Sequence, residues 1–153
     1  MNIASVRPYL RLRFLLPALA VVAGLVVLLE RLILTDAERI GKVLGRIERC
    51  SLEGRWDDAF AFLDPSLRLE GLTKEELRAH VRTTLGDRPL KKWNVMEKKV
   101  EVQEGGVATV YLRVLIEGPP GSPLQQPYAY DFDIGFRKVP DAGWVIVSVL
   151  FKG

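Results

Sequence analysis

Residues 92–117, KWNVMEKKVEVQEGGVATVYLRVLIE, decide the fold of this chain. Apolar and polar side chains alternate along both halves of the stretch, and Gly105-Gly106 separates the halves. A period of two is typical of strands, and a glycine pair between two such runs indicates a tight hairpin. The alternation returns after a longer, proline-containing connection, with Asp141-Ala142-Gly143 as a second turn. We therefore predict four antiparallel strands, over residues 92–103, 107–117, 127–138 and 143–151.

Three helical segments are expected before the strands. Two of them begin with a capping box, in which a Thr side chain binds the amide three residues on and a Glu side chain reaches back. All three carry apolar residues at helical spacing, which predicts one face packed on a core. The first has the box Thr35/Glu38 and ends at Gly54, the second runs from Trp56 to Leu63, and the third has the box Thr73/Glu76 and ends at Gly86. Helices followed by an antiparallel meander predict an α+β domain, with three helices packed on a curved four-stranded sheet.

The N-terminal part has a different composition. Residues 14–29, FLLPALAVVAGLVVLL, carry no charge, and the apolar run resumes at residues 32–34. A membrane span needs about 17 to 25 mostly apolar residues. We therefore predict a basic N-terminus (1–13), a transmembrane signal-anchor helix (14–34) and one domain (35–153). A cleaved signal peptide is the alternative. Since three arginines precede the run, the N-terminus is expected in the cytoplasm and the domain outside it.

The net charge of +3 belongs to this N-terminal part. Residues 1–34 hold four of the 22 basic and one of the 19 acidic residues, which leaves 18 of each sign in the rest of the chain. Domains that bind nucleic acid usually carry a basic face, so nucleic acid is not an expected partner. One Cys and one His cannot supply the usual four-ligand metal site, and we expect neither a metal nor a cofactor.

The adjacent acids Asp57 and Asp58 have an ordinary structural explanation. Both fall in the first turn of the expected second helix, where the helix dipole favours negative charge. Neighbouring residues on a helix point about 100° apart, so the two carboxylates do not aim into one pocket. Asp64 precedes Pro65, a pairing that usually ends a helix. We expect no paired-carboxylate chemistry from these residues.

Alternation also sorts the strand residues into two faces. One face of the second and third strands is uniformly apolar and is expected to meet the helices. The opposite, outer face carries polar residues that are expected to form ion pairs between strands: Tyr111, Arg113, Asp131 and Asp133. The last strand is apolar on both sides, with Trp144 and Ile146 on one and Val145, Val147 and Val149 on the other. Its outer side is therefore expected to be covered or to meet a partner.

The order of these elements resembles a known superfamily. An initial helix, then SLEGRWDDAFAFLDPSL with its small helix, a capped third helix and a curved four-stranded meander are similar to the nuclear transport factor 2-like superfamily, the cystatin-like cone. The resemblance covers residues 35–151. Members often place a short strand or hairpin between the second and third helices, for which residues 65–72 leave little room.

The resemblance implies two kinds of function. Enzymes of the ketosteroid isomerase and dehydratase kinds place acids or histidines inside the cone. Other members are non-catalytic domains on one N-terminal membrane helix, facing the periplasm, that serve as assembly or scaffold parts. Here the expected inner faces of the second and third strands offer tyrosines but no carboxylate that could act as a general base.

We therefore expect a non-catalytic interaction domain, anchored in a bacterial inner membrane and facing the periplasm. It would bind a protein partner or form a homodimer through the outer face of the sheet, with Tyr111, Arg113, Asp131 and Asp133 as contact residues. One alternative is a small apolar ligand inside the cone. A further alternative is an isomerase-like or dehydratase-like enzyme that uses His80. The candidate pocket residues are His80, Tyr128, Tyr130, Phe132 and Trp144.

Overall fold

The computed structural model describes residues 17–28 and 35–153, and the chain divides into two units, 1–35 and 36–153. A helix covers residues 17–28. In the described ranges, none of the helices has the length and apolar character needed to cross a membrane. The predicted span over residues 14–34 lies partly outside these ranges and stays a prediction.

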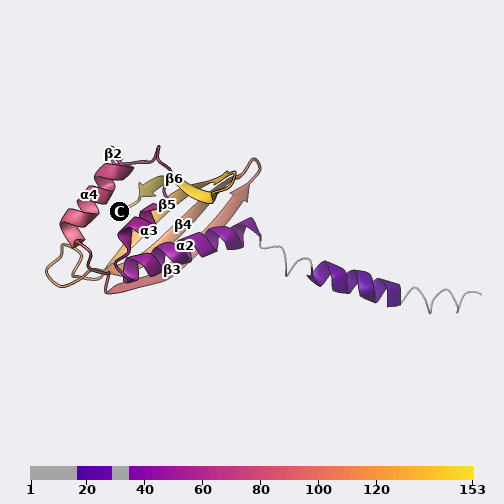
Figure 1. Cartoon of the computed structure of the whole chain (residues 1–153). Helices are drawn as coiled ribbons and strands as arrows, with labels where there is room; N and C mark the ends of the chain where they lie inside the picture. The colour runs from indigo at the N-terminus through magenta and orange to yellow at the C-terminus, as the bar shows by residue number, and fades with distance from the viewer. Residues whose placement is uncertain (1–16, 29–34) are drawn as a thin grey trace, which may run out of the picture. The chain divides into compact units, whose positions relative to one another are not determined.

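The second unit is built on a four-stranded antiparallel sheet in the order β3-β4-β5-β6. The strands are β3 (Lys92–Gln103), β4 (Val107–Glu117), β5 (Tyr128–Val139) and β6 (Gly143–Phe151). Each predicted strand is confirmed to within one residue. The longer connection, which the sequence analysis placed between the second and third strands, joins β4 to β5 (Figure 1).

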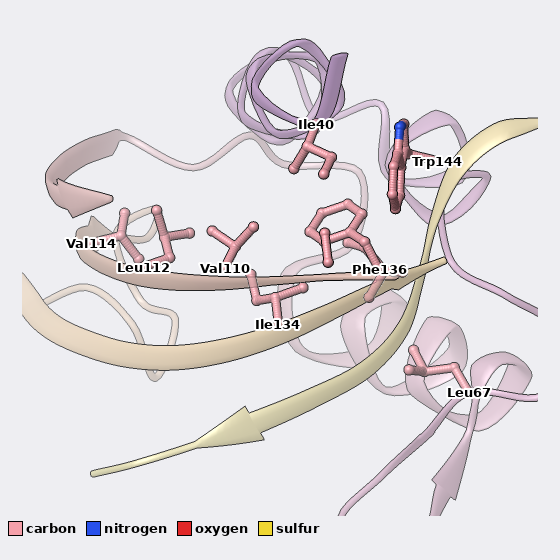
Figure 2. Close-up of a cluster of buried hydrophobic side chains, with 10 residues drawn as sticks. Ile40, Leu67, Val110, Leu112, Val114, Ile134, Phe136 and Trp144 are labelled. Atoms are coloured by element: carbon pink, nitrogen blue, oxygen red, sulfur yellow. The ribbon is translucent and has the colours of Figure 1, made fainter. Parts of the chain in front are cut away.

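The hydrophobic core lies between the inner face of this sheet and helix α2 (Asp36–Leu52). Ala108, Val110, Leu112 and Val114 of β4 are all buried, as the alternation predicted. In Figure 2, Ile40 of α2 points down onto these residues, close to Phe136 and Trp144. A single helix laid across the sheet therefore supplies the other layer of the core.

The predicted second helix is shorter than expected. Helix α3 (Trp56–Phe60) ends three residues before the predicted Leu63. The chain then runs alongside β6, where Asp64 N–H donates to Ile146 O at 2.8 Å and Ile146 N–H donates to Phe62 O at 2.9 Å. These bonds explain the early end of the helix, because the Phe62 carbonyl and the Asp64 amide pair with β6 instead of continuing the helix.

A short hairpin lies between α3 and the next helix, where the sequence analysis expected room for very little. Strands β1 (Arg68–Leu69) and β2 (Leu72–Thr73) pair through a turn at Glu70-Gly71. Both turn residues have positive φ, 51° and 85°, as the tightest hairpin turns require. The elements expected of the superfamily resemblance are therefore all present in the described domain.

Helix α4 (Lys74–Leu85) follows directly, and its predicted capping box is confirmed. The Thr73 hydroxyl accepts a hydrogen bond from Glu76 N–H at 3.1 Å, and the Glu76 carboxylate accepts one from Thr73 N–H at 2.8 Å. The hydrogen bond from the Thr73 backbone is the main reason that the pKa of Glu76 is lowered. Gly86 is the C-cap, also as predicted.

A β-bulge changes the faces of β6. The register between β5 and β6 shifts between Gly135 and Phe136, so that Gly135 lies opposite Ser148 and Ile134 opposite Val149. The prediction that Val149 shares the outer face with Val145 is therefore wrong. Val149 packs against the core, while Ser148 is exposed beside Gly135. Beyond the bulge, the inner face of β6 ends in Phe151, which lies opposite Phe132.

Candidate functional site

The four predicted contact residues lie together on the outer face of the sheet. Arg113 of β4 pairs directly with Asp131 of β5 in the strand register, and Tyr111 pairs with Asp133. The Tyr111 hydroxyl donates to Asp131 Oδ1 at 3.3 Å, and Arg113 Nε lies 3.5 Å from the same oxygen. The expected ion pairing between strands is thus present, and Asp131 is its centre.

Two lysines extend this network on either side of Tyr111. Lys99 Nζ lies 5.9 Å and Lys152 Nζ 5.8 Å from the centre of the Tyr111 ring. Lys152 also pairs with Asp133 at 2.6 Å, and Lys99 with Glu97 at 3.0 Å. We call these seven residues the outer-face network: Glu97, Lys99, Tyr111, Arg113, Asp131, Asp133 and Lys152.

The contacts of the network raise the pKa of three of its members. Burial is the main cause that raises the pKa of Tyr111, and the charge of Asp131 raises it further. The hydrogen bond to Asp133 raises the pKa of Lys152, and the one to Glu97 raises the pKa of Lys99. Tyr111 therefore remains a neutral hydrogen-bond donor, flanked by two cations.

The sequence analysis missed three members of this network. Glu97 reaches the outer face because the β3–β4 register shifts between Val95 and Glu97, so simple alternation assigns it to the wrong face. Lys152 follows the last strand residue and had no predicted role. Lys99 lies opposite Tyr111, but only the observed register shows this pairing.

Asp57 and Asp58 form ion pairs with arginines. Asp57 accepts from Arg78 Nε at 2.7 Å and from Arg82 Nη2 at 2.8 Å, which joins α3 to α4. The hydrogen bond from Arg78 is the main cause that lowers the pKa of Asp57. Asp58 pairs instead with Arg55, at 2.7 Å. The two carboxylates thus have separate arginine partners, although both line one surface pocket together with Arg55 and Arg82.

The five candidate pocket residues do not lie in one place. His80 is exposed on α4. Trp144 is buried, and its Nε1 donates to Asp36 Oδ1 at 3.3 Å. Tyr128, Tyr130 and Phe132 form an aromatic row along β5, with ring centres 5.1 and 6.1 Å apart, and Tyr128 keeps 56% of its surface exposed.

An apolar cavity of about 210 Å³ lies elsewhere, between α2, α3, α4 and β6. None of the five predicted residues lines it. The lining side chains are apolar except for one hydroxyl: Ile47, Ser51, Trp56, Ala59, Phe60, Leu63, Leu77, Val81 and Ile146. Most of these lining residues belong to the apolar stripes of the predicted helices, which were expected to pack in the core. The position of a cavity between three helices depends on how the helices pack, and the apolar stripes do not predict that packing.

No family model and no curated protein sequence matches this chain. Several solved structures do match in fold. Bd1075 from Bdellovibrio bacteriovorus has a TM-score of 0.63 and 11% identity over 75% of this chain, and the chain spans 40% of its length. An NTF2-like protein of unknown function in nutrient uptake from Rhodospirillum rubrum gives 0.62 and 18%, covering 74% of this chain and 96% of that one.

A ketosteroid isomerase-like protein from Parabacteroides distasonis gives a TM-score of 0.53 and 16% identity, over 74% of this chain and 84% of that one. Identities this low show the fold alone, because one fold hosts many functions. The described domain therefore has the NTF2-like, cystatin-like α+β fold, the fold that the resemblance implied.

Proposed function

We propose that this chain is a single-span protein of a bacterial inner membrane, with a non-catalytic periplasmic domain that binds a protein partner or a second copy. Residues 14–34 would be the anchor, supported by the uncharged stretch 14–29 behind a basic N-terminus. Residues 35–153 would bind through the outer face of the sheet.

The outer-face network is the observation that carries this proposal. An exposed sheet face is usually polar without being organised. Here a half-buried Tyr is flanked by two lysines and hydrogen-bonded to an acid that also pairs with Arg113. Leu150, which lies opposite Asp133 of the network, has 61% of its surface exposed. Tyr and Arg are the residues most often found as energetic centres of protein interfaces.

The charges of the network suit a second copy of the chain. Its three cations are balanced by three carboxylates on the same face. In a twofold dimer, one patch contacts itself, so a patch with both signs can place each cation opposite an acid. A partner protein with a mixed face would fit in the same way.

The double substitution Tyr111→Ala with Arg113→Ala tests this surface. Full-length chain is purified from native membranes in mild detergent, then sized and analysed by mass spectrometry for a partner. We expect the variant to bind its partner or second copy at least about 30-fold more weakly, since truncated interface centres cost about 2 kcal/mol or more. The matched control is Lys92→Ala with Glu101→Ala, on the same face but outside the network. Unchanged assembly in a folded variant would contradict the placement.

A small apolar ligand is the second candidate function, and the cavity between the helices favours it. Ser51 is 2% exposed and contributes the one hydroxyl among the side chains that line the cavity. The space is open to solvent on one side, and its volume of about 210 Å³ suits a molecule of one or two rings with one polar group, since a closed apolar cavity of about 150 Å³ holds benzene. Solvent extraction of the purified chain and mass spectrometry would detect such a molecule.

The cavity lining also supports a non-catalytic role. It contains no carboxylate, imidazole, thiol or amine, so no residue there can act as a general base. The enzyme alternative through His80 loses its geometric basis, because His80 is exposed on α4 and does not line the cavity.

A further inference from the structure

Helix α2 carries its positive charge on one side. Its four basic residues follow one another at intervals of three, four and three, which confines them to an arc of about 80° around the helix axis. All four are exposed, and the stripe flanks the apolar face that contains Ile40. We call these residues the basic stripe: Arg39, Lys42, Arg46 and Arg49.

The stripe is poorly neutralised. Arg39 has a weak partner, Asp36, at 3.7 Å. Within residues 35–153, the side chains of Lys42, Arg46 and Arg49 make no hydrogen bond or ion pair. Arg49 has a structural explanation, because a cation in the last turn favours the helix dipole. Arg46 lies one turn earlier and has no such explanation. Residues 35–153 as a whole carry 18 basic and 18 acidic residues, so this local excess of positive charge is distinctive.

The stripe borders a groove at its C-terminal end. Arg46 and Arg49 line it together with Arg55 and with Ala61 and Phe62 beyond α3, and its volume is about 410 Å³. Asp58 and Cys50 complete the lining, and Asp58 with Glu53 holds the Arg55 guanidinium. Guanidinium groups bind phosphate oxygens in a bidentate manner. Arg46 and Arg49, which no carboxylate holds, lie beside an apolar wall and are suited to a phosphate that carries an apolar chain.

We propose that the basic stripe binds the phosphate groups of an anionic phospholipid surface. From Arg39 to Arg49 the stripe is about 15 Å long, which matches a plane of phosphates better than a single small anion. Helix α2 also begins two residues after the predicted span, so its first turns would lie near the bilayer. The inference rests on the proposed anchor. Each cation near an anionic bilayer strengthens binding by about fivefold.

The test uses the full-length chain in lipid discs, either of phosphatidylcholine alone or with added phosphatidylglycerol. A reagent selective for arginine modifies the exposed guanidinium groups, and mass spectrometry gives the rate at each site. We expect Arg46 and Arg49 to react at least about fivefold more slowly in the anionic discs, and the protection to disappear at high salt. Arg113, on the sheet, is the internal control and should react equally in both.

A variant separates the stripe from the groove. Arg39→Gln with Lys42→Gln removes two of the four charges without touching the groove. We expect the variant to bind the anionic surface about 25-fold more weakly, so that Arg46 and Arg49 lose their protection. Lys91→Gln with Lys92→Gln, which removes the same charge where β3 begins and outside the outer-face network, should leave the protection unchanged. The proposal would be overturned if Arg46 and Arg49 reacted at the same rate in both kinds of disc. It would also be overturned if inorganic phosphate protected them in neutral discs as well as the anionic discs do. A chain that enters neither disc would overturn both the stripe and the anchor.

Discussion

Phe136→Ala is expected to lower the free energy of unfolding by about 3 to 5 kcal/mol. Phe136 is 0% exposed and lies opposite Ala108 on one neighbouring strand and Ile146 on the other. Removing its ring would leave a cavity at the point where the sheet meets α2 and Trp144 (Figure 2). Total stabilities are about 5 to 15 kcal/mol, so this loss is a large share of the whole. Urea unfolding followed by tryptophan fluorescence measures it.

Phe151→Ala is the matched control. The same side chain is lost from the same inner face, but Phe151 is 40% exposed and lies at the end of β6. We expect a loss of no more than about 1.5 kcal/mol, because less apolar surface leaves the core and solvent can fill the space. Similar losses for both variants would mean that the core does not centre on Phe136, and would contradict the observed register.

The strands could be predicted because their pattern is local. The runs in residues 92–151 alternate over most of their length and are bounded by glycine or proline, so both the period and the ends are readable. The burial of Val110 and Val114 follows from this alternation alone. The Thr73 capping box is equally local, since both of its partners lie within three residues.

The features that were missed depend on contacts between distant segments. The bulge at Gly135 moves Val149 inward, and a glycine within a strand is the one sequence sign that could have indicated it. Helix α3 ends early because residues 62–64 pair with Ile146, more than 80 residues later in the chain. The turn at Glu70-Gly71 was not predicted, because Glu-Gly is not one of the usual turn pairs and the two-residue strands are too short for periodicity to detect.

The outer face was predicted better than the cavity for a similar reason. Strand register follows from the hairpins, so Tyr111, Arg113, Asp131 and Asp133 could be placed on one face from the sequence. The cavity depends on how α2, α3 and α4 pack around it. The predicted lining from β5 assumed that the space lies above the sheet, whereas the helices form nearly all of its walls.

Gly54→Ala is expected to lower the free energy of unfolding by about 2 to 4 kcal/mol, the second large effect. Gly54 has φ of 72°, and an added Cβ would lie 2.5 Å from the backbone oxygen of Asp87. The Arg55 N–H bonds Cys50 O at 2.8 Å across this glycine, which closes the end of α2. The substitution therefore strains the cap and pushes away the segment that follows α4.

Gly45→Ala separates these effects from any general response of α2 to alanine. No heavy atom lies within 4 Å of a Cβ added at Gly45, in the middle of the same helix. Alanine there should raise the free energy of unfolding by about 0.5 to 1 kcal/mol, because the unfolded chain loses freedom. Both variants are measured by urea unfolding. If Gly54→Ala were as stable as Gly45→Ala, the close approach of α2 to Asp87 would not exist in solution. The cavity, which lies between α2 and α4, would then have a different shape.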